Sequence, residues 1–160
     1  RTSSVSDCWP TTESEPSPAP VAAAGGMLAC MKAFRAAVEA GDFDALPSLC
    51  AEDVVFRSPI AHKPYQGRET LGAILRAVSR VFEDLTYIRE IGGGESPDSA
   101  LVFVAKVGGL EINGCDFLHT NSDGLIDEFT VMLRPLKAVN AFADRMAEEF
   151  AEEMRRAGLA

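Results

Sequence analysis

Residues 110–133 decide the fold, and they read LEINGCDFLHT, NSDG and LIDEFTVML in succession. The first and third segments have the composition and length of β-strands. Between them, Asn, Ser, Asp and Gly at positions 121–124 are residue types that favour a tight turn. The stretch therefore predicts an antiparallel β-hairpin.

Two more predicted strands, 85–91 and 100–107, come directly before this hairpin. The Gly-rich segment 92–98 separates them, and Gly108-Gly109 marks the turn that leads into the hairpin. Four strands joined by turns in this way predict a curved antiparallel sheet.

The sequence before these strands is mostly helical. An apolar stripe predicts a first helix over about 27–41, a second, short helix follows at 44–49, and a third opens at Arg68. A short strand at 54–56 lies between the last two helices and ends at Ser58-Pro59. Beyond the sheet, Pro135 starts a final helix over about 136–157, with an apolar stripe opposite a glutamate-rich face.

This order of elements predicts one α+β domain over 27–160. We expect the curved antiparallel sheet to pack against the three N-terminal helices and to enclose a cone, whose mouth is a natural small-molecule pocket. Residues 1–26 are rich in Ser, Thr, Pro and Ala and have no apolar periodicity, so we expect a disordered tail.

Composition excludes several classes of partner. The chain carries 24 acidic and 15 basic residues, a net charge of −9, which disfavours nucleic acid and anionic membranes as partners. No stretch approaches the ~20 apolar residues that a membrane-spanning helix requires. The four cysteines, Cys8, Cys30, Cys50 and Cys115, lack the spacing of metal or redox motifs. We therefore expect free thiols in a reducing, cytoplasmic compartment, and neither a metal nor an organic cofactor.

Four motifs in this order and spacing resemble the nuclear transport factor 2-like superfamily, in its SnoaL-like or ketosteroid-isomerase-like branch. They are EAGDFDAL at 39–46, VVFRSP at 54–59, YQGRE at 65–69 and DGLI at 123–126. The resemblance implies a cone-shaped cystatin-like α+β barrel with an apolar pocket, frequent homodimers, and many different activities. The long final helix is a second reason to expect a homodimer.

The same resemblance implies where catalytic groups would lie. The position of the first-helix tyrosine of ketosteroid isomerases holds Phe34, the position of their general base holds Ser58, and the position of their buried aspartic acid holds Asp116. A hydroxyl such as that of Ser58 is too weakly basic to remove a proton beside a carbonyl unaided. Ketosteroid isomerase activity proper is therefore not expected.

Asp116 is the most informative residue of the hairpin. The even positions of its strand read Ile112, Gly114, Asp116 and Leu118, so an inward even face would place a carboxyl group among apolar side chains. Burial would then raise its pKa and leave a neutral acid that can donate a hydrogen bond. The alternative is that the odd face is inward and Asp116 lies in solvent.

Three further candidates follow the first predicted strand. His62 would supply a base that titrates near neutrality, and Ser58 or Tyr65 would supply a hydroxyl that positions a ligand. The alternative for His62 and Tyr65 is a structural role in the loop. We expect the pocket walls to include Phe34, Val38, Leu75, Phe82, Phe103, Ala105, Gly114, Phe129 and Val131, for which simple core packing is the rival interpretation.

Two functions remain open on the sequence. The first is an isomerase, cyclase or hydrolase that acts on a small apolar compound with a carbonyl or epoxide group, with Asp116 as the acid. The second is a non-catalytic ligand-binding or dimerisation domain that retains the cone but lacks the base of the family.

Overall fold

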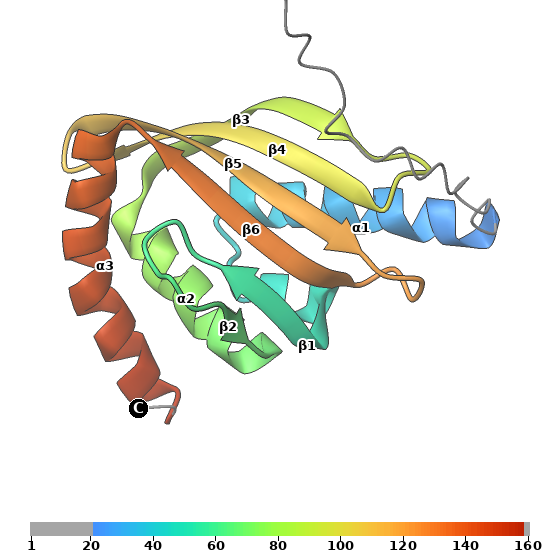
Figure 1. Cartoon of the computed structure of the whole chain (residues 1–160), viewed down its shortest axis with the longest axis horizontal. Coiled ribbons are helices and arrows are strands. Elements are labelled where there is room, and N and C mark those ends of the chain that lie inside the picture. The colour runs from blue at the N-terminus through green and yellow to red at the C-terminus, as the bar shows by residue number, and fades with distance from the viewer. Residues whose placement is uncertain (1–20, 159–160) are drawn as a thin grey trace, which may run out of the picture.

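A computed structural model describes residues 21–158 of the chain (Figure 1). Its elements, in chain order, are α1 (Val21–Glu39), the 3₁₀ helix η1 (Leu46–Leu49), β1 (Cys50–Arg57), β2 (Tyr65–Gln66), α2 (Arg68–Val81), β3 (Glu83–Gly92), β4 (Asp98–Val107), β5 (Leu110–Thr120), β6 (Ile126–Arg134) and α3 (Leu136–Arg156). The α+β class and the predicted order of helices and strands are confirmed.

The six strands form one sheet in the order β2-β1-β6-β5-β4-β3. Strands β3 to β6 are the predicted antiparallel succession, but β1 runs parallel to β6, so the sheet is mixed and not wholly antiparallel. The sheet is also open, with β2 and β3 at its edges, and does not close into a barrel. The predicted antiparallel order of strands β3 to β6 is confirmed. The parallel pairing of β1 with β6 was not predicted, because the residues of β1 carry no signal about which distant strand lies beside them.

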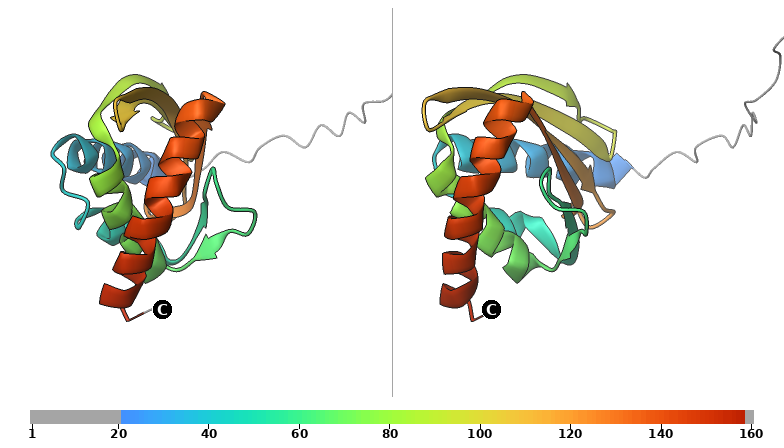
Figure 2. Two further views of the ribbon diagram at one scale, coloured as in Figure 1. Left: turned by 90° about the vertical axis from the view of Figure 1, so that its left-hand side faces the viewer. Right: turned by 60° about the vertical axis from the view of Figure 1, so that its left-hand side comes forward.

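Helices α1 and α2 lie on one side of the curved sheet, and α3 stands beside α2 at one end of it (Figures 1 and 2). The main core lies between these layers, with large buried side chains from α1 (Phe34), α2 (Leu71) and β4 (Leu101 and Phe103). The first helix begins at Val21 and not at Met27, and residues 1–20 of the expected tail lie outside the described residues.

Side chains of β5 alternate cleanly between the two faces of the sheet. Ile112, Asp116 and Leu118 are buried on the helix side, whereas Phe117 is 41% exposed on the other. Ile88 and Ile91 of β3 and Met132 of β6 are likewise exposed. The even face of β5 is thus the inward one, and Asp116 lies on it.

Helix α3 is attached to α2 by ion pairs near its C-terminal end. The carboxylate of Glu153 is almost fully buried, and Arg76 and Arg80 of α2 both donate hydrogen bonds to it. Arg80 also pairs with Glu149 at 2.7 Å. These arginines hold the pKa of the Glu153 carboxyl below its usual range, against the opposing effect of its desolvation. None of the helices in the described part of the chain combines the length and apolarity that crossing a membrane requires.

Candidate functional site

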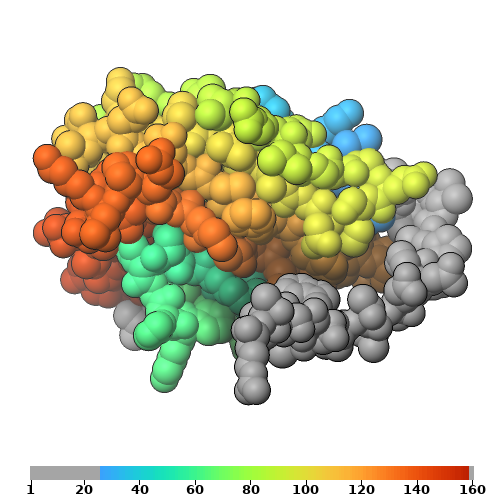
Figure 3. Space-filling view, turned by 45° about the horizontal axis from the view of Figure 1, so that its top comes forward, coloured from blue at the N-terminus to red at the C-terminus, as the bar shows by residue number. Residues whose placement is uncertain are grey.

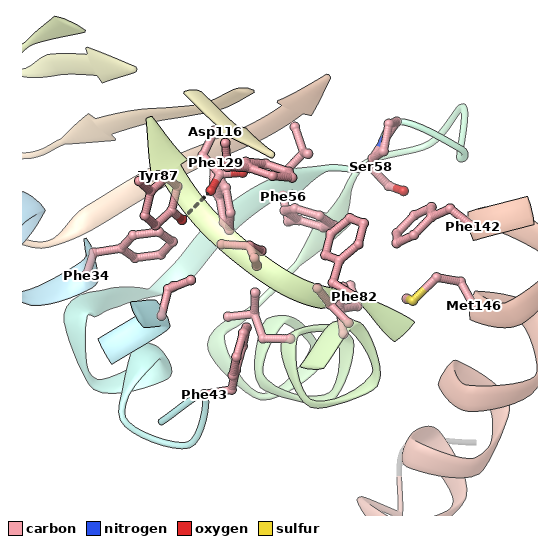
Figure 4. A pocket seen from close by; sticks show the side chains of 18 residues that line it. Phe34, Phe43, Phe56, Ser58, Phe82, Tyr87, Asp116, Phe129, Phe142 and Met146 are labelled. Carbon is pink, nitrogen blue, oxygen red and sulfur yellow. Dashed lines mark hydrogen bonds between the residues drawn. The ribbon is translucent and has the colours of Figure 1, made fainter. Parts of the chain in front are cut away.

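A cavity of about 50 Å³ lies between the concave face of the sheet and the three α-helices. We call it the inner cavity. Most of its lining is aromatic or aliphatic, and its lining residues are Phe34, Val38, Phe43, Phe56, Ser58, Pro59, Ile74, Leu75, Val78, Phe82, Leu85, Tyr87, Phe103, Asp116, Phe129, Val131, Phe142 and Met146 (Figure 4).

Two polar side chains meet at one end of the inner cavity. The Tyr87 hydroxyl of β3 donates a hydrogen bond to Oδ2 of Asp116 on β5, at 2.7 Å (Figure 4). Strand register brings them together across β4. Tyr87 pairs with Phe103 of β4, and Leu101, two residues before Phe103 and on the same face of the sheet, pairs with Asp116. Both side chains are buried, and Asp116 is only 6% exposed.

This environment changes the acidity of both groups. Burial raises the pKa of Asp116 to about 7, and the hydrogen bond from Tyr87 opposes this rise by stabilising the carboxylate. Burial, together with the adjacent carboxyl group, raises the pKa of Tyr87 above its usual range. At neutral pH the pair therefore offers a carboxyl group that is poised between its neutral and ionised forms, beside a hydroxyl that stays protonated.

Aromatic rings fix the shape of the cavity around this pair. Phe129 of β6 lies between Phe34 and Phe56, with ring centroids 5.4 Å and 5.1 Å away and edge-to-face geometry. Phe82 lies 5.6 Å from Phe103 and stacks on Phe142 of α3 at 4.9 Å. These rings surround the pair with apolar surface, and this burial is what raises the pKa of Asp116.

The opposite end of the inner cavity is its mouth, lined by Ser58 and Pro59 after β1 and by Phe142 and Met146 of α3. Figure 4 shows Ser58, Phe142 and Met146 on the side of the cavity away from Tyr87. The mouth adjoins a second hollow of about 260 Å³, which we call the outer groove. Its lining residues are Phe56, Ser58, Ile60, Ala61, Tyr65, Ile74, Ala143, Met146, Ala147 and Phe150.

Most of the side chains expected to form pocket walls do line the inner cavity; they are Phe34, Val38, Leu75, Phe82, Phe103, Phe129 and Val131. Ala105 and Gly114 are buried but do not line it. At Gly114 the reason is steric, because the ring of Phe103 lies where a side chain would start. Ala105 pairs with Ile112 further along β4, so it lies in the surrounding core.

The three loop candidates separate from Asp116. Ser58 lines both the inner cavity and the outer groove, and Tyr65 lines only the outer groove, where its ring meets Phe150 edge-on at 5.6 Å. His62 is exposed on the loop between β1 and β2 and lines neither hollow. The expected grouping of His62 with Asp116 therefore does not occur.

Sequence reasoning missed Tyr87 and the contribution of α3. The residue type of Tyr87 was a usable signal, since a tyrosine inside a predicted strand has a hydroxyl that requires a partner when buried. The long final helix was a reason to expect a homodimer, which stays a prediction, and its Phe142 and Met146 side chains also line the inner cavity of their own domain. Within residues 21–158, no group of three or more His, Cys, Asp or Glu side chains is placed to hold a metal ion.

Together, the cone-like α+β fold and the apolar cavity with one buried carboxyl group define a class of small domains built around an internal pocket. Residues 31–129 match the family described as SnoaL-like domain. The chain belongs to this family, within the nuclear transport factor 2-like superfamily.

Solved structures agree with this assignment. The chain is 35% identical to a steroid delta-isomerase from Pseudomonas aeruginosa (81% of this chain and 95% of that chain covered, TM-score 0.76). It is 37% identical to an uncharacterised protein with a cystatin-like fold from Silicibacter pomeroyi (81% and 91%, TM-score 0.75). An NTF2-like protein from Mesorhizobium loti shares the fold at 17% identity (70% and 93%, TM-score 0.60). None of the curated proteins matches the chain.

Proposed function

We propose that the inner cavity binds the oxygen-bearing end of a small apolar molecule, and that Asp116 acts on it as an acid in an isomerase-type reaction. The neutral carboxyl group passes its proton to a carbonyl oxygen of the ligand, while a water molecule takes a proton from the carbon between the carbonyl group and the double bond. That water then returns its proton to the far carbon of the double bond, and the enol proton returns to Asp116, so the double bond moves and the acid is restored. The Tyr87 hydroxyl holds the carboxyl group in place and stabilises the carboxylate that remains.

One observation carries the proposal, which is the buried Asp116–Tyr87 pair at the end of an aromatic cavity. A carboxyl group with a pKa of about 7 retains a proton at neutral pH and can also release it, as general acid catalysis requires. The similarity to the steroid delta-isomerase at 35% identity supports isomerisation over cyclisation or hydrolysis.

The same geometry favours a second candidate, ligand binding without turnover. Among the described residues that line the inner cavity, only Asp116 and Tyr87 have side chains that titrate, and the resemblance to ketosteroid isomerases aligns Ser58 with the position of their general base. A reaction that requires a separate base from the protein would therefore lack one. A homodimer also remains a prediction, which sedimentation at micromolar concentration would test.

Turnover of a β,γ-unsaturated ketone, followed by the ultraviolet absorbance of the conjugated product, separates the two candidates. If Asp116 is the acid, D116N lowers kcat/KM by about 10²–10⁴-fold, whereas D123N in the exposed turn after β5 leaves it unchanged. The wild-type rate should fall as pH rises through about 7, since the protonated form is the active one. Turnover by D116N at the wild-type rate would refute the proposal, and binding without turnover by the wild type would establish the second candidate.

A further inference from the structure

We propose that the outer groove is the second compartment of the binding site and that it holds the apolar chain of the ligand whose oxygen reaches Asp116. This inference rests on the proposed function and adds the substrate class. The ligand is an elongated, uncharged molecule with one oxygen function near one end and an aliphatic or ring-containing body.

Size is the first argument. The inner cavity measures about 50 Å³, about a third of the ~150 Å³ of an engineered protein cavity that binds benzene. It therefore accommodates the oxygen-bearing end of a ligand and little else. The outer groove adds about 260 Å³, and the two hollows together reach the ~300 Å³ at which ligand pockets begin.

Continuity is the second argument. Phe56, Ser58, Ile74 and Met146 line both hollows, so the two are separated by a single layer of side chains. Met146 is a flexible, unbranched side chain that lies at the mouth, opposite the end where Tyr87 meets Asp116 (Figure 4). Rotation of its side chain alone would widen the connection while the helix stays in place.

The chemistry of the lining identifies the class of ligand. The groove is lined by the Ala143, Ala147 and Phe150 side chains of α3 on one side and by Ile60 and Ala61 of the loop after β1 on the other. No charged side chain lines it, and Ser58 and Tyr65 are its only hydroxyl-bearing residues. Such a surface favours an uncharged apolar chain and gives a carboxylate or phosphate no partner.

Helix α3 supplies one wall of this compartment. The family match ends at residue 129, whereas α3 begins at Leu136. The wall formed by α3 therefore lies outside the matched region. In Figure 3 the loop after β1 stands out from the surface on the same side of the molecule as α3.

A homologous series of straight-chain methyl ketones, from 2-butanone to 2-dodecanone, tests the inference by calorimetric titration. Burial of each added methylene group should tighten the dissociation constant about fourfold. For the wild type we expect this gain to continue beyond the length that fills the inner cavity. The ¹³C-methyl signal of Ala143, which lines the outer groove and not the inner cavity, should shift only with the longer ketones, because they alone extend past the mouth when bound.

Two tryptophan substitutions on α3 form a matched pair. A147W fills the outer groove and should abolish the gain for the longer ketones while short ketones still bind. A151W places the same side chain at an exposed position of the same helix outside the groove and should bind the whole series like the wild type. An unchanged chain-length dependence in A147W would overturn the inference, as would failure of the wild type to bind any long ketone.

D116N distinguishes this result from failure of the proposed function. If both ideas hold, D116N weakens every ketone by a similar factor and leaves the dependence on chain length intact. If only the groove is correct, D116N binds the series as tightly as the wild type, and the dependence on chain length again persists. Loss of the dependence in A147W alone therefore reports on the groove and not on Asp116.

Discussion

The two ends of the inner cavity differ in how they are built. At the inner end, strands β3 to β6 fix the Asp116–Tyr87 pair through their register, and the rings around it are fully packed. At the mouth, a loop and helix α3 meet across apolar side chains, and α3 is attached to α2 by partly exposed ion pairs. The comparison indicates that the two polar side chains lie where the structure is most tightly packed. Entry of a ligand to the inner cavity depends on the mouth, where fewer contacts hold the loop and α3 together.

The largest expected effect tests this difference in rigidity. F34A removes a ring that is 1% exposed and packs edge-on against Phe129, so it should lower the free energy of unfolding by about 3–5 kcal/mol. F150A removes a half-buried ring of the outer groove and should cost about 1 kcal/mol. Urea denaturation of both variants measures the contrast, and equal losses would show that the mouth is as tightly packed as the inner end.

The next effect concerns the charge of Asp116. Its folded-state pKa of about 7 exceeds the ~3.9 of an unperturbed aspartate. The folded protein therefore retains a proton that the unfolded chain releases between these values. The stability that this proton contributes is fully present below about pH 4 and is lost as pH rises through about 7.

Between pH 5 and pH 8 the free energy of unfolding should thus fall by about 2–3 kcal/mol through this group alone. D116N removes the titration and should flatten the profile in that range, whereas D123N should not. Thermal or urea unfolding at several pH values measures it. A D116N profile as steep as that of the wild type would show that Asp116 has an ordinary pKa and that the inner end is wetter than its packing implies.

The inner end also shows what could be predicted from the sequence and what could not. The alternation of Ile112, Gly114, Asp116 and Leu118 was enough to define two possible faces for Asp116. Tyr87 could not be paired with it, because the seven-residue glycine-rich segment 92–98 leaves the register between β3 and β4 open. A local pattern determines which way a side chain points, but not which side chain of another strand it meets.

Similar reasoning explains the errors elsewhere. The helices and the four consecutive strands follow from local periodicity, and their predicted bounds lie close to the observed ones except at the start of the first helix, which begins six residues earlier than predicted. The parallel pairing of β1 with β6 and the packing of α3 onto the mouth are contacts between distant segments. The apolar stripe of α3 indicated that it is buried but did not identify the surface that buries it.

A smaller effect is expected at the ion pairs that hold α3. E153Q removes the charge of a carboxylate that is 3% exposed, but its partners Arg76 and Arg80 remain about one-third exposed, so the loss should be only about 1 kcal/mol at low salt. The loss should shrink in 1 M salt, where exposed charges are screened. E148Q, at an exposed position of the same helix, is the control. A loss that salt does not change would mean that packing, and not charge, attaches α3.

The smallest expected effect concerns His62, which the sequence offered as a base. Because its side chain is exposed and lines neither hollow, H62A should change stability by less than about 0.5 kcal/mol and kcat/KM by less than about twofold. Kinetics with the same unsaturated ketone would measure this, with D116N as the positive control. A large loss of activity in H62A would mean that the loop folds over the mouth during turnover and brings a base to the ligand. The contrast between an inner end that holds the titratable side chains and a mouth that holds none would then fail, because the loop would supply the missing base.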